Sequence, residues 1–438
     1  MRIAYIAAGA GGMYCGSCIH DNTLAAALLK QGAEVTLIPT YTPLRTDEDG
    51  VSVEEVFYGG VNVFLQEKLW PFRHTPRLVD WLFDRPGLLR WVSQTFSAST
   101  SPADLGALTV SVLEGEAGHQ KKELRRLASW IGDQVKPDIV HLTNSMFAGM
   151  AGYLKDQLGV PVLCSIKGEE LFLDALVEPY RSRARATLRS RARDIDGFIS
   201  PGQWYSDFMS EYLALPVSRF HPVKLGVNLT GCGVAEERPG FPFTIGYLAR
   251  IAPEKGLHLL ADAFKLVAQR AGSMPVRLRV AGWLGRGGRA YYTNVVEGLS
   301  NAGLTGSMEF VGEVDRAEKL RFLQSLDVLS VPTVYEDPKG LYVLEALANG
   351  VPVVQPRHGS FPELIEWTGG GILVEPNSSE SLANGIEQLM NDGPRRHALG
   401  HSGMKTVHES FTAQAMALET ISVYERFVRR GNERRGER

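Results

Sequence analysis

Two carboxylates with seven residues between them are the first candidates for chemistry in this sequence. Asp337 follows an apolar run that ends near Thr333, and Glu345 lies in the apolar stretch after Gly340. If Gly340 opens a helix, both carboxylates lie at the same end of that element, and the N–H groups of its first turn can face an anion. One carboxylate could then hold sugar hydroxyls and the other a ribose diol. The alternative is that Asp337 caps the helix and Glu345 is a solvated charge.

Arg250 and Lys255 form a second candidate site, which also follows an apolar run. Arginine offers a planar fork of donors and lysine a compact point charge. Such a pair suits a diphosphate, whose negative charge must be held and then stabilised as it grows on a leaving group. The alternative is a surface ion pair between Arg250 or Lys255 and Glu254.

The elements that position these residues follow an alternating pattern along the chain. Arg2–Ala7 and Ala33–Pro39 are short apolar runs, and Thr23–Gln31 between them has helical spacing, which is typical of a doubly wound parallel sheet. Strands alternate with helical patterns such as Lys255–Gln269 and Leu341–Asn349, so the crossovers should be right-handed. The other predicted strands are Asp138–Leu142, Pro161–Ile166, Gly197–Ser200, Phe243–Leu248, Arg277–Ala281, Glu309–Val311, Val328–Val331 and Val351–Gln355.

We therefore expect an α/β protein with two doubly wound Rossmann-like domains that face a cleft, since 438 residues exceed one compact core. The first domain is predicted over residues 1–230, with a helical insertion at about 64–130. The second is predicted over 231–410, and 411–438 should form a helix that packs back on the first domain. The insertion is rich in tryptophan and arginine, which favours either a lid over an acceptor pocket or a membrane-interface segment. The basic tail from Arg426 is expected to fray.

Composition limits the possible classes of function. Hydrophobic residues make up 44% and charged residues 22% of the chain, which is typical of a globular protein, and a net charge of -3 argues against nucleic-acid binding. The cysteines are too few and too scattered for a disulfide framework, which indicates a reducing compartment. No apolar stretch approaches the ~20 residues of a membrane span. We expect a cytoplasmic protein, with at most peripheral contact with the inner membrane face. The four cysteines are Cys15, Cys18, Cys164 and Cys232.

The second half of the chain resembles the nucleotide-binding domain of retaining family 4 glycosyltransferases, which have the GT-B fold. The family's E-x7-E motif lies in a longer pattern that matches Pro332–Val354, and its G-R-x-x-x-x-K-G motif matches Ala249–Gly256. The resemblance covers most of Phe243–Met390 and is fainter, but in order, over residues 1–228. Two further turns fit the family pattern, at Gly359–Glu363 and Gly371–Pro376.

The resemblance implies a donor site. Arg250 and Lys255 should hold the diphosphate of a nucleotide sugar, and Glu345 the ribose hydroxyls. Backbone N–H groups of Gly340 and Leu341 would face the phosphate. The glycine-rich loop of the first domain, with Gly11 and Gly12, would approach the donor from the other domain.

The resemblance also implies catalytic residues, and here the chain departs from the pattern. Asp337 stands where the family has the first glutamate, which contacts the transferred sugar, and Glu336 beside it is an alternative. Lys167 stands where the family has a histidine, and Glu169 follows it. We expect Asp337, Lys167 and Glu169 to be the catalytic residues, with the acceptor bound by the first domain.

The expected function is transfer of a hexose, with retention, from UDP- or GDP-hexose to a sugar, lipid or small-molecule acceptor. No cofactor or metal is expected, because Arg250 and Lys255 could neutralise the phosphates. The expected partners are the nucleotide sugar and a carbohydrate or lipid-linked acceptor. Three alternatives share the scaffold: a nucleotide-sugar epimerase, a phosphorylase, and a catalytically weak protein that only binds nucleotide sugars. Fold alone does not separate them.

Overall fold

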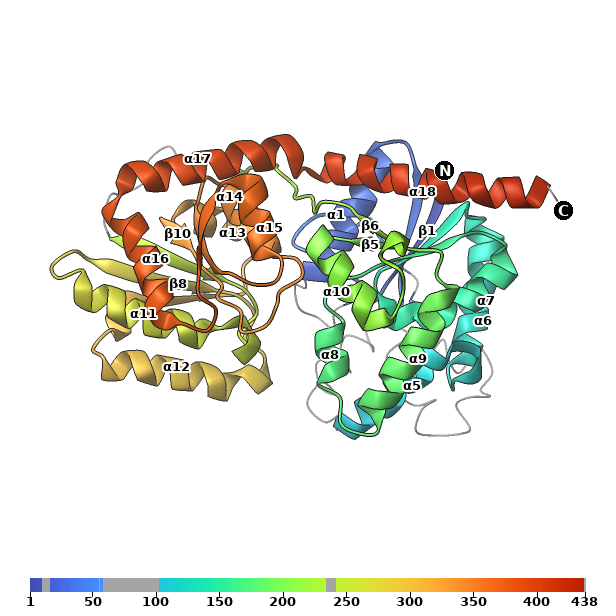
Figure 1. Ribbon diagram of the computed structural model, residues 1–438, viewed down its shortest axis with the longest axis horizontal. Coiled ribbons are helices and arrows are strands. Elements are labelled where there is room, and N and C mark those ends of the chain that lie inside the picture. The colour runs from blue at the N-terminus through green and yellow to red at the C-terminus, as the bar shows by residue number, and fades with distance from the viewer. Residues whose placement is uncertain (10–15, 55, 58–101, 234–241, 437–438) are drawn as a thin grey trace. The chain divides into compact units, whose positions relative to one another are not determined.

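The protein folds into two compact units (Figure 1). The computed structural model describes residues 1–9, 16–54, 56–57, 102–233 and 242–436. Unit 1 consists of Met1–Gly226 together with Ala413–Arg438, and unit 2 of Val227–Thr412. The sequence placed these divisions at 230/231 and 410/411.

Unit 1 contains a parallel sheet that has six strands among the described residues, in the order β2-β1-β3-β4-β5-β6. The short edge strand β6 was not predicted, because it has only three residues and is half exposed. The strands are β1 (Arg2–Ala7), β2 (Glu34–Pro39), β3 (Ile139–Leu142), β4 (Val162–Ser165), β5 (Gly197–Ser200) and β6 (Phe220–Pro222).

Helices cover both faces of this sheet, and alternate residues of β1 show how. Ala4 and Ile6 belong to one apolar cluster, which includes α5 and α6, whereas Ile3 and Tyr5 belong to another, which includes α1 and α18. This alternation follows from the two-residue period of a strand. The helices are α1 (Gly16–Lys30), α5 (Pro102–Glu114), α6 (Lys121–Trp130), α7 (Ala148–Leu158), α8 (Glu170–Asp174), α9 (Tyr180–Arg191), α10 (Gln203–Leu213) and α18 (Ala413–Gly436).

The prediction of a frayed tail was wrong. Helix α18 continues to Gly436, past the basic residues that begin at Arg426. Val423 and Tyr424 are buried in unit 1, and Phe427 and Val428 pack against the same cluster. This apolar stripe anchors the helix, so the charged residues of the tail remain on a helix that is already formed.

Several predictions lie outside the described residues. They concern Gly11, Gly12 and Cys15, and the insertion up to residue 101. The later part of the insertion is described, and it forms α5 and α6. Buried side chains such as Leu113 and Leu127 make these helices part of the core of unit 1.

Unit 2 also has a parallel sheet of six strands among its described residues, in the order β12-β11-β10-β7-β8-β9. The run that forms β12 was noted only as a motif. The strands are β7 (Phe243–Leu248), β8 (Val276–Ala281), β9 (Met308–Gly312), β10 (Val328–Leu329), β11 (Val353–Pro356) and β12 (Gly371–Val374). The helices are α11 (Leu257–Arg270), α12 (Arg289–Asn301), α13 (Arg316–Gln324), α14 (Leu341–Ala348), α15 (Phe361–Thr368), α16 (Ser379–Asn391) and α17 (Gly393–Ser410).

The strand order of each unit reverses at one point, and there the loops open at the carboxyl edge of the sheet. In unit 2 the reversal lies between β7 and β10, and the order is that of a dinucleotide-binding fold. In unit 1 it lies between β1 and β3. Ligands of open α/β sheets bind at such switch points, so the loops that follow these four strands are the first places to look for a site.

Candidate functional site

Two loops of unit 2 meet at its switch point. The loop after β7 ends in a 3-10 turn, Pro253–Lys255, and Gly256 follows it with a φ of 72°. A Cβ atom at Gly256 would lie 1.8 Å from the carbonyl oxygen of Pro332 in the loop after β10. The N–H of Val334 also donates to the carbonyl of Glu254 at 3.0 Å. Only glycine permits this approach, which brings Lys255 against the loop that carries Asp337.

Asp337 is almost completely buried, with 2% of its surface exposed. Burial disfavours its ionisation, but the Lys255 ammonium and the hydrogen bonds outweigh burial, so the pKa of Asp337 lies well below its ordinary value. Both of its oxygens accept hydrogen bonds. The donors are Lys255 Nζ (2.7 Å), Tyr335 OH (3.0 Å) and Tyr342 OH (3.2 Å) to Oδ2, and the backbone N–H groups of Lys339 (3.0 Å) and Gly340 (3.2 Å) to Oδ1.

Lys255 is held by the same residues from the other side. Its Nζ donates to Tyr335 OH at 2.6 Å and lies 4.9 Å and 5.6 Å from the ring centres of Tyr335 and Tyr342. Burial and the Asp337 carboxylate raise the pKa of both tyrosines well above the ordinary value, so both hydroxyls stay protonated. The Lys255 side chain is 17% exposed, so it is partly accessible at the surface of the unit.

Arg250 and the first turn of α14 complete this part of the unit. The Arg250 guanidinium pairs with Glu254 at 2.5 Å and is 44% exposed. The ion pair of the alternative interpretation is therefore present, on an accessible side chain. Gly340, the N-cap of α14, has a φ of 57°, and Leu341 begins the helix. The N–H of Gly340 donates to Asp337 Oδ1 at 3.2 Å, so, contrary to the prediction from the sequence, it is not available to a phosphate. The N–H of Leu341 has no acceptor within the helix and can face an anion.

Glu345 lies within α14 and is held by α13. Lys319 Nζ donates to Glu345 Oε1 at 2.6 Å, and the two side chains are 8% and 17% exposed. The ion pair fixes a partly accessible carboxylate on a rigid helix, which suits a group that accepts hydrogen bonds from a diol.

Lys167 follows β4 in unit 1 and lies in a buried polar cluster. Its ammonium is bonded to Asp21 of α1, and the side chains are 5% and 2% exposed. Tyr5 OH and Thr143 Oγ1 each donate to Asp21 at 2.5 Å, and each lies 3.4 Å from Lys167 Nζ. Burial opposes ionisation of Asp21, yet Lys167 and His20 hold its pKa well below the ordinary value.

Glu169 and Glu170 shape the same loop. Glu169 accepts hydrogen bonds from the backbone N–H groups of Lys167 (2.7 Å) and Ser145 (2.8 Å), which ties the loop after β4 to the loop after β3. Glu170 accepts one from Tyr205 OH. Burial, and then the neighbouring Glu169, raise the pKa of Glu170 to about 7.

His141 lies on β3 and is completely buried in unit 1. It stacks on Tyr5 with ring centres 4.3 Å apart, Nε2 contacts Ser165 Oγ at 2.8 Å, and Nδ1 is bonded to Tyr424 OH of α18. Burial, followed by the Lys167 charge, lowers the pKa of His141 to about 3, so it remains neutral. It is a core histidine that connects α18 to the sheet.

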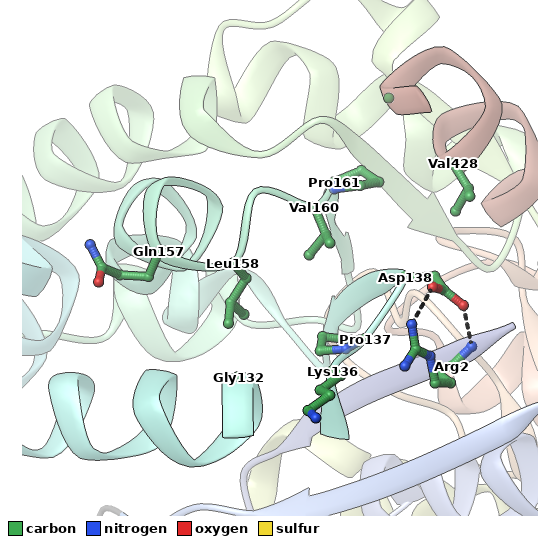
Figure 2. Close-up of a pocket in the computed structure, with 11 residues that line it drawn as sticks. Arg2, Gly132, Lys136, Pro137, Asp138, Gln157, Leu158, Val160, Pro161 and Val428 are labelled. Atoms are coloured by element: carbon green, nitrogen blue, oxygen red, sulfur yellow. Dashed lines mark hydrogen bonds and ion pairs between the residues drawn. The ribbon is translucent and has the colours of Figure 1, made fainter. Parts of the chain in front are cut away.

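A pocket at the opposite edge of the unit 1 sheet carries none of the candidate residues. Figure 2 shows that Arg2 and Asp138, joined by two hydrogen bonds, line it together with Lys136 and Val428. Arg2 begins β1 and Asp138 precedes β3, so the pocket lies at the amino ends of the strands, away from the switch point. Over the described part of the chain, no group of three or more His, Cys, Asp or Glu side chains is placed to hold a metal ion.

The structure brings together Lys255, Asp337 and Gly340 in unit 2, and separately Lys167 and Glu169 in unit 1. Sequence reasoning missed the partners that hold them. Tyr335 and Tyr342 flank Asp337 in the chain and could have been noticed. Asp21 is 146 positions from Lys167 and has no local signal. Lys319 is also on an element that no motif covers. The missed partners are Tyr335, Tyr342, Lys319, Asp21, Tyr5 and Thr143.

Comparison with known proteins identifies the class. Residues 235–406 match the family described as glycosyl transferases group 1, and residues 22–226 match the glycosyl transferase 4-like domain. The fold is similar to that of sucrose-phosphate synthase from Thermosynechococcus elongatus, with a TM-score of 0.70, 17% identity, and coverage of 97% of this chain and 98% of that one. A structure of HepE from Anabaena in complex with UDP has a TM-score of 0.67 and 14% identity, over 97% of this chain and 100% of that one. The chain belongs to the GT-B glycosyltransferases of the group 1/family 4 type.

Relatives in sequence are glycosyltransferases of several kinds. An uncharacterized glycosyltransferase of Methanocaldococcus jannaschii is 29% identical, over 47% of this chain and 51% of that protein. The capsular polysaccharide biosynthesis glycosyltransferase CapM of Staphylococcus aureus is 28% identical, over 43% and 47%. The chain thus spans about half the length of these two relatives. A glycogen synthase of Mycobacterium tuberculosis is 25% identical, over 70% and 72%. Among the helices that the structure describes, none is long and apolar enough to span a membrane.

Proposed function

We propose that this glycosyltransferase is a retaining hexosyltransferase whose unit 2 binds a nucleotide diphosphate sugar, either UDP- or GDP-hexose. The acceptor is a carbohydrate, a lipid-linked sugar or a small molecule, bound by unit 1. UDP is bound in the structure of the similar Anabaena protein HepE, which supports a nucleotide donor. Retention of configuration comes from the resemblance to family 4.

The observation that carries the proposal is the position of Lys255 at the switch point of unit 2. Lys255 lies on the loop after β7, its ammonium contacts Asp337 in the loop after β10 at 2.7 Å, and its side chain is 17% exposed. A fixed cation at this edge suits a diphosphate. Arg250 and the N–H of Leu341 add further donors for its oxygens, whereas the N–H of Gly340 already donates to Asp337 Oδ1.

The mechanism follows from these charges. Lys255, Arg250 and the first turn of α14 stabilise the negative charge that grows on the diphosphate as its bond to the sugar breaks. The departing phosphate oxygen accepts the proton of the acceptor hydroxyl. Glu345, held by Lys319 at 2.6 Å, accepts hydrogen bonds from the ribose diol.

Lys167 and Glu169 contribute on the side of unit 1. Lys167 replaces the family histidine, but its ammonium is bonded to Asp21 within the unit. Glu169 accepts hydrogen bonds from the N–H groups of Lys167 and Ser145. Both residues thereby hold the shape of the loop after β4, on which the acceptor side of the reaction depends. Gly11 and Gly12 lie outside the described residues, so the role that the resemblance implies for them stays a prediction.

Thermal unfolding with UDP, GDP, ADP and their hexose conjugates tests the donor. A ligand at a hundred times its Kd should stabilise the protein by about 2.7 kcal/mol. We expect one base to stabilise the wild type and the double variant Arg250→Ala/Lys255→Ala to lose the effect. Release of nucleoside diphosphate from the same conjugate then distinguishes a transferase from a protein that only binds nucleotide sugars. If none of the three bases binds, the proposal is wrong.

A further inference from the structure

We propose that Asp337 is a positioning residue that acts through Lys255 and does not contact the transferred sugar. The inference rests on the proposed function, because it assigns a role within the same donor site. It differs from the role that the resemblance implies for the first carboxylate of the E-x7-E motif.

The hydrogen bonds of Asp337 leave no room for a sugar hydroxyl. A carboxylate offers about four lone-pair positions, and Asp337 accepts from five donors. Two of these donors are backbone N–H groups of its own loop, which cannot leave without remodelling the start of α14. With 2% of the residue exposed, a ligand has almost no surface of Asp337 to approach.

The same bonds fix Lys255 in one orientation. Two of its three ammonium protons are directed to Tyr335 OH at 2.6 Å and to Asp337 Oδ2 at 2.7 Å, and the rings of Tyr335 and Tyr342 flank its charge. The third proton remains for a phosphate oxygen. A lysine side chain loses much rotamer freedom when it is fixed, and here that loss is met before a ligand binds.

Aspartate suits this task better than glutamate. The shorter side chain keeps its carboxylate among the N–H groups of Lys339 and Gly340, while Oδ2 points to Lys255. A glutamate carries one more methylene, so its side chain would have to fold back for its carboxylate to accept from those N–H groups. The departure from the family pattern is thereby explained by the local hydrogen bonds.

The test compares ligands with and without the sugar. Asp337→Asn removes the charge and keeps the shape, so Lys255 loses its anchor. We expect the Kd of the nucleoside diphosphate that binds the wild type, among UDP, GDP and ADP, to rise about 5- to 20-fold. The Kd of its hexose conjugate should rise by the same factor. In a Lys255→Met background, Asp337→Asn should change either Kd by less than about twofold. Glu366→Gln, on an exposed residue of the same unit, controls for the change of charge.

Three results would overturn the inference. Weaker binding of the hexose conjugate alone would show contact with the sugar. Additive effects of the two substitutions would show that Asp337 does not act through Lys255, and tighter binding of the diphosphate would show that it competes with the ligand. Failure of the wild type to bind any of the three diphosphates would refute the proposed function, before any variant is made, and this inference with it.

A second variant covers the case in which Asp337→Asn does not fold. Tyr335→Phe removes the hydroxyl that contacts both Lys255 and Asp337, and leaves the ring. We expect it to raise both Kd values by one factor of about 2 to 5. Labelling of Lys255 by an amine reagent, relative to the exposed Lys30, should also increase in this variant. Unchanged labelling together with unchanged Kd values would refute the inference.

Discussion

Each unit of this glycosyltransferase has a lysine–aspartate pair at the switch point of its sheet, and the two pairs differ in their access to solvent. In unit 1 the Lys167 and Asp21 side chains are 5% and 2% exposed, and the hydroxyls of Tyr5 and Thr143 also donate hydrogen bonds to Asp21. In unit 2 the Lys255 and Asp337 side chains are 17% and 3% exposed, and the hydroxyls of Tyr335 and Tyr342 also donate hydrogen bonds to Asp337. The lysine–aspartate pair of unit 1 is therefore closed to solvent, whereas in unit 2 the lysine side chain is partly exposed.

The difference separates a structural role from a binding role. A buried ion pair contributes little beyond the cost of its desolvation, but loss of one partner leaves an uncompensated charge. The cost of such a charge is greatest in the pair of unit 1, where both side chains are buried. The Lys255 side chain is partly exposed, so its ammonium can exchange part of its environment for phosphate oxygens. We therefore expect substitutions in the first pair to affect stability and those in the second to affect ligand binding.

Lys167→Met should have the largest effect on stability. It leaves the Asp21 carboxylate buried without its counter-charge, which typically costs about 3–5 kcal/mol of unfolding free energy. Urea unfolding measures the loss, and Lys255→Met is the matched variant with a smaller expected loss. The double variant Lys167→Met/Asp21→Asn should recover part of the stability. A loss below about 1 kcal/mol for Lys167→Met would mean that the pair is not closed.

Lys255→Met should have the largest effect on binding. A hydrogen bond to a charged group contributes roughly 1.5–3 kcal/mol, so the Kd of the nucleoside diphosphate should rise about 10- to 100-fold. Titration calorimetry checks this, with Lys167→Met as the control, whose Kd should stay within about twofold at a temperature where it is folded. Equal effects of the two variants on binding would remove the distinction between the pairs.

Lys319→Met tests whether the partner of Glu345 matters for binding. Without the ion pair at 2.6 Å, Glu345 is free to change rotamer, so the nucleoside diphosphate should bind about 3- to 10-fold more weakly. Lys265→Met, at a lysine that pairs with Asp262 on α11, is the matched control and should have no effect. The same measurement with a 2′-deoxynucleotide should show little further loss in Lys319→Met.

Glu170→Gln tests the difference between the two units through the pH dependence of stability. The pKa of Glu170 is raised to about 7, so its contribution is full below the unfolded pKa near 4.5 and is lost as pH rises through 7. The pKa of Asp337 is lowered, so its contribution is present at neutral pH and is lost as pH falls through the acid range. From pH 5 to pH 8 the wild type should lose on the order of 1 kcal/mol relative to Glu170→Gln. A constant difference between their unfolding free energies would contradict the shift.

The sequence predicts the fold class well because the signal is repetitive. Strands such as Phe243–Leu248 and Gly197–Ser200 agree with the structure residue for residue. Weak elements were missed where the pattern is short: β6 has three residues, and β12 begins at a glycine. The sequence predicted a helix over 411–438 but also a frayed tail from Arg426. The helix continues past Arg426 because its anchor lies in Val423 and Tyr424, before the charged residues that dominate the composition of the tail.

The candidate site was less accessible to sequence reasoning. The motifs predict that Lys255 and Asp337 belong to one nucleotide-sugar site, but their direct contact depends on the approach of Gly256 to Pro332. The pair of Lys167 with Asp21 joins residues 146 positions apart, and only the parallel sheet brings them together. Residue types suggest which groups can do chemistry, whereas burial decides which of them a ligand can reach.

Hydrogen–deuterium exchange of the full chain, with and without the nucleoside diphosphate that stabilises it, tests whether Lys255 of unit 2 binds the diphosphate. We expect slower exchange in two segments of unit 2, 250–256 and 333–345, and loss of this protection in Lys255→Met. Protection confined to unit 1, or the same protection in Lys255→Met, would contradict the claim that unit 2 binds the diphosphate through Lys255.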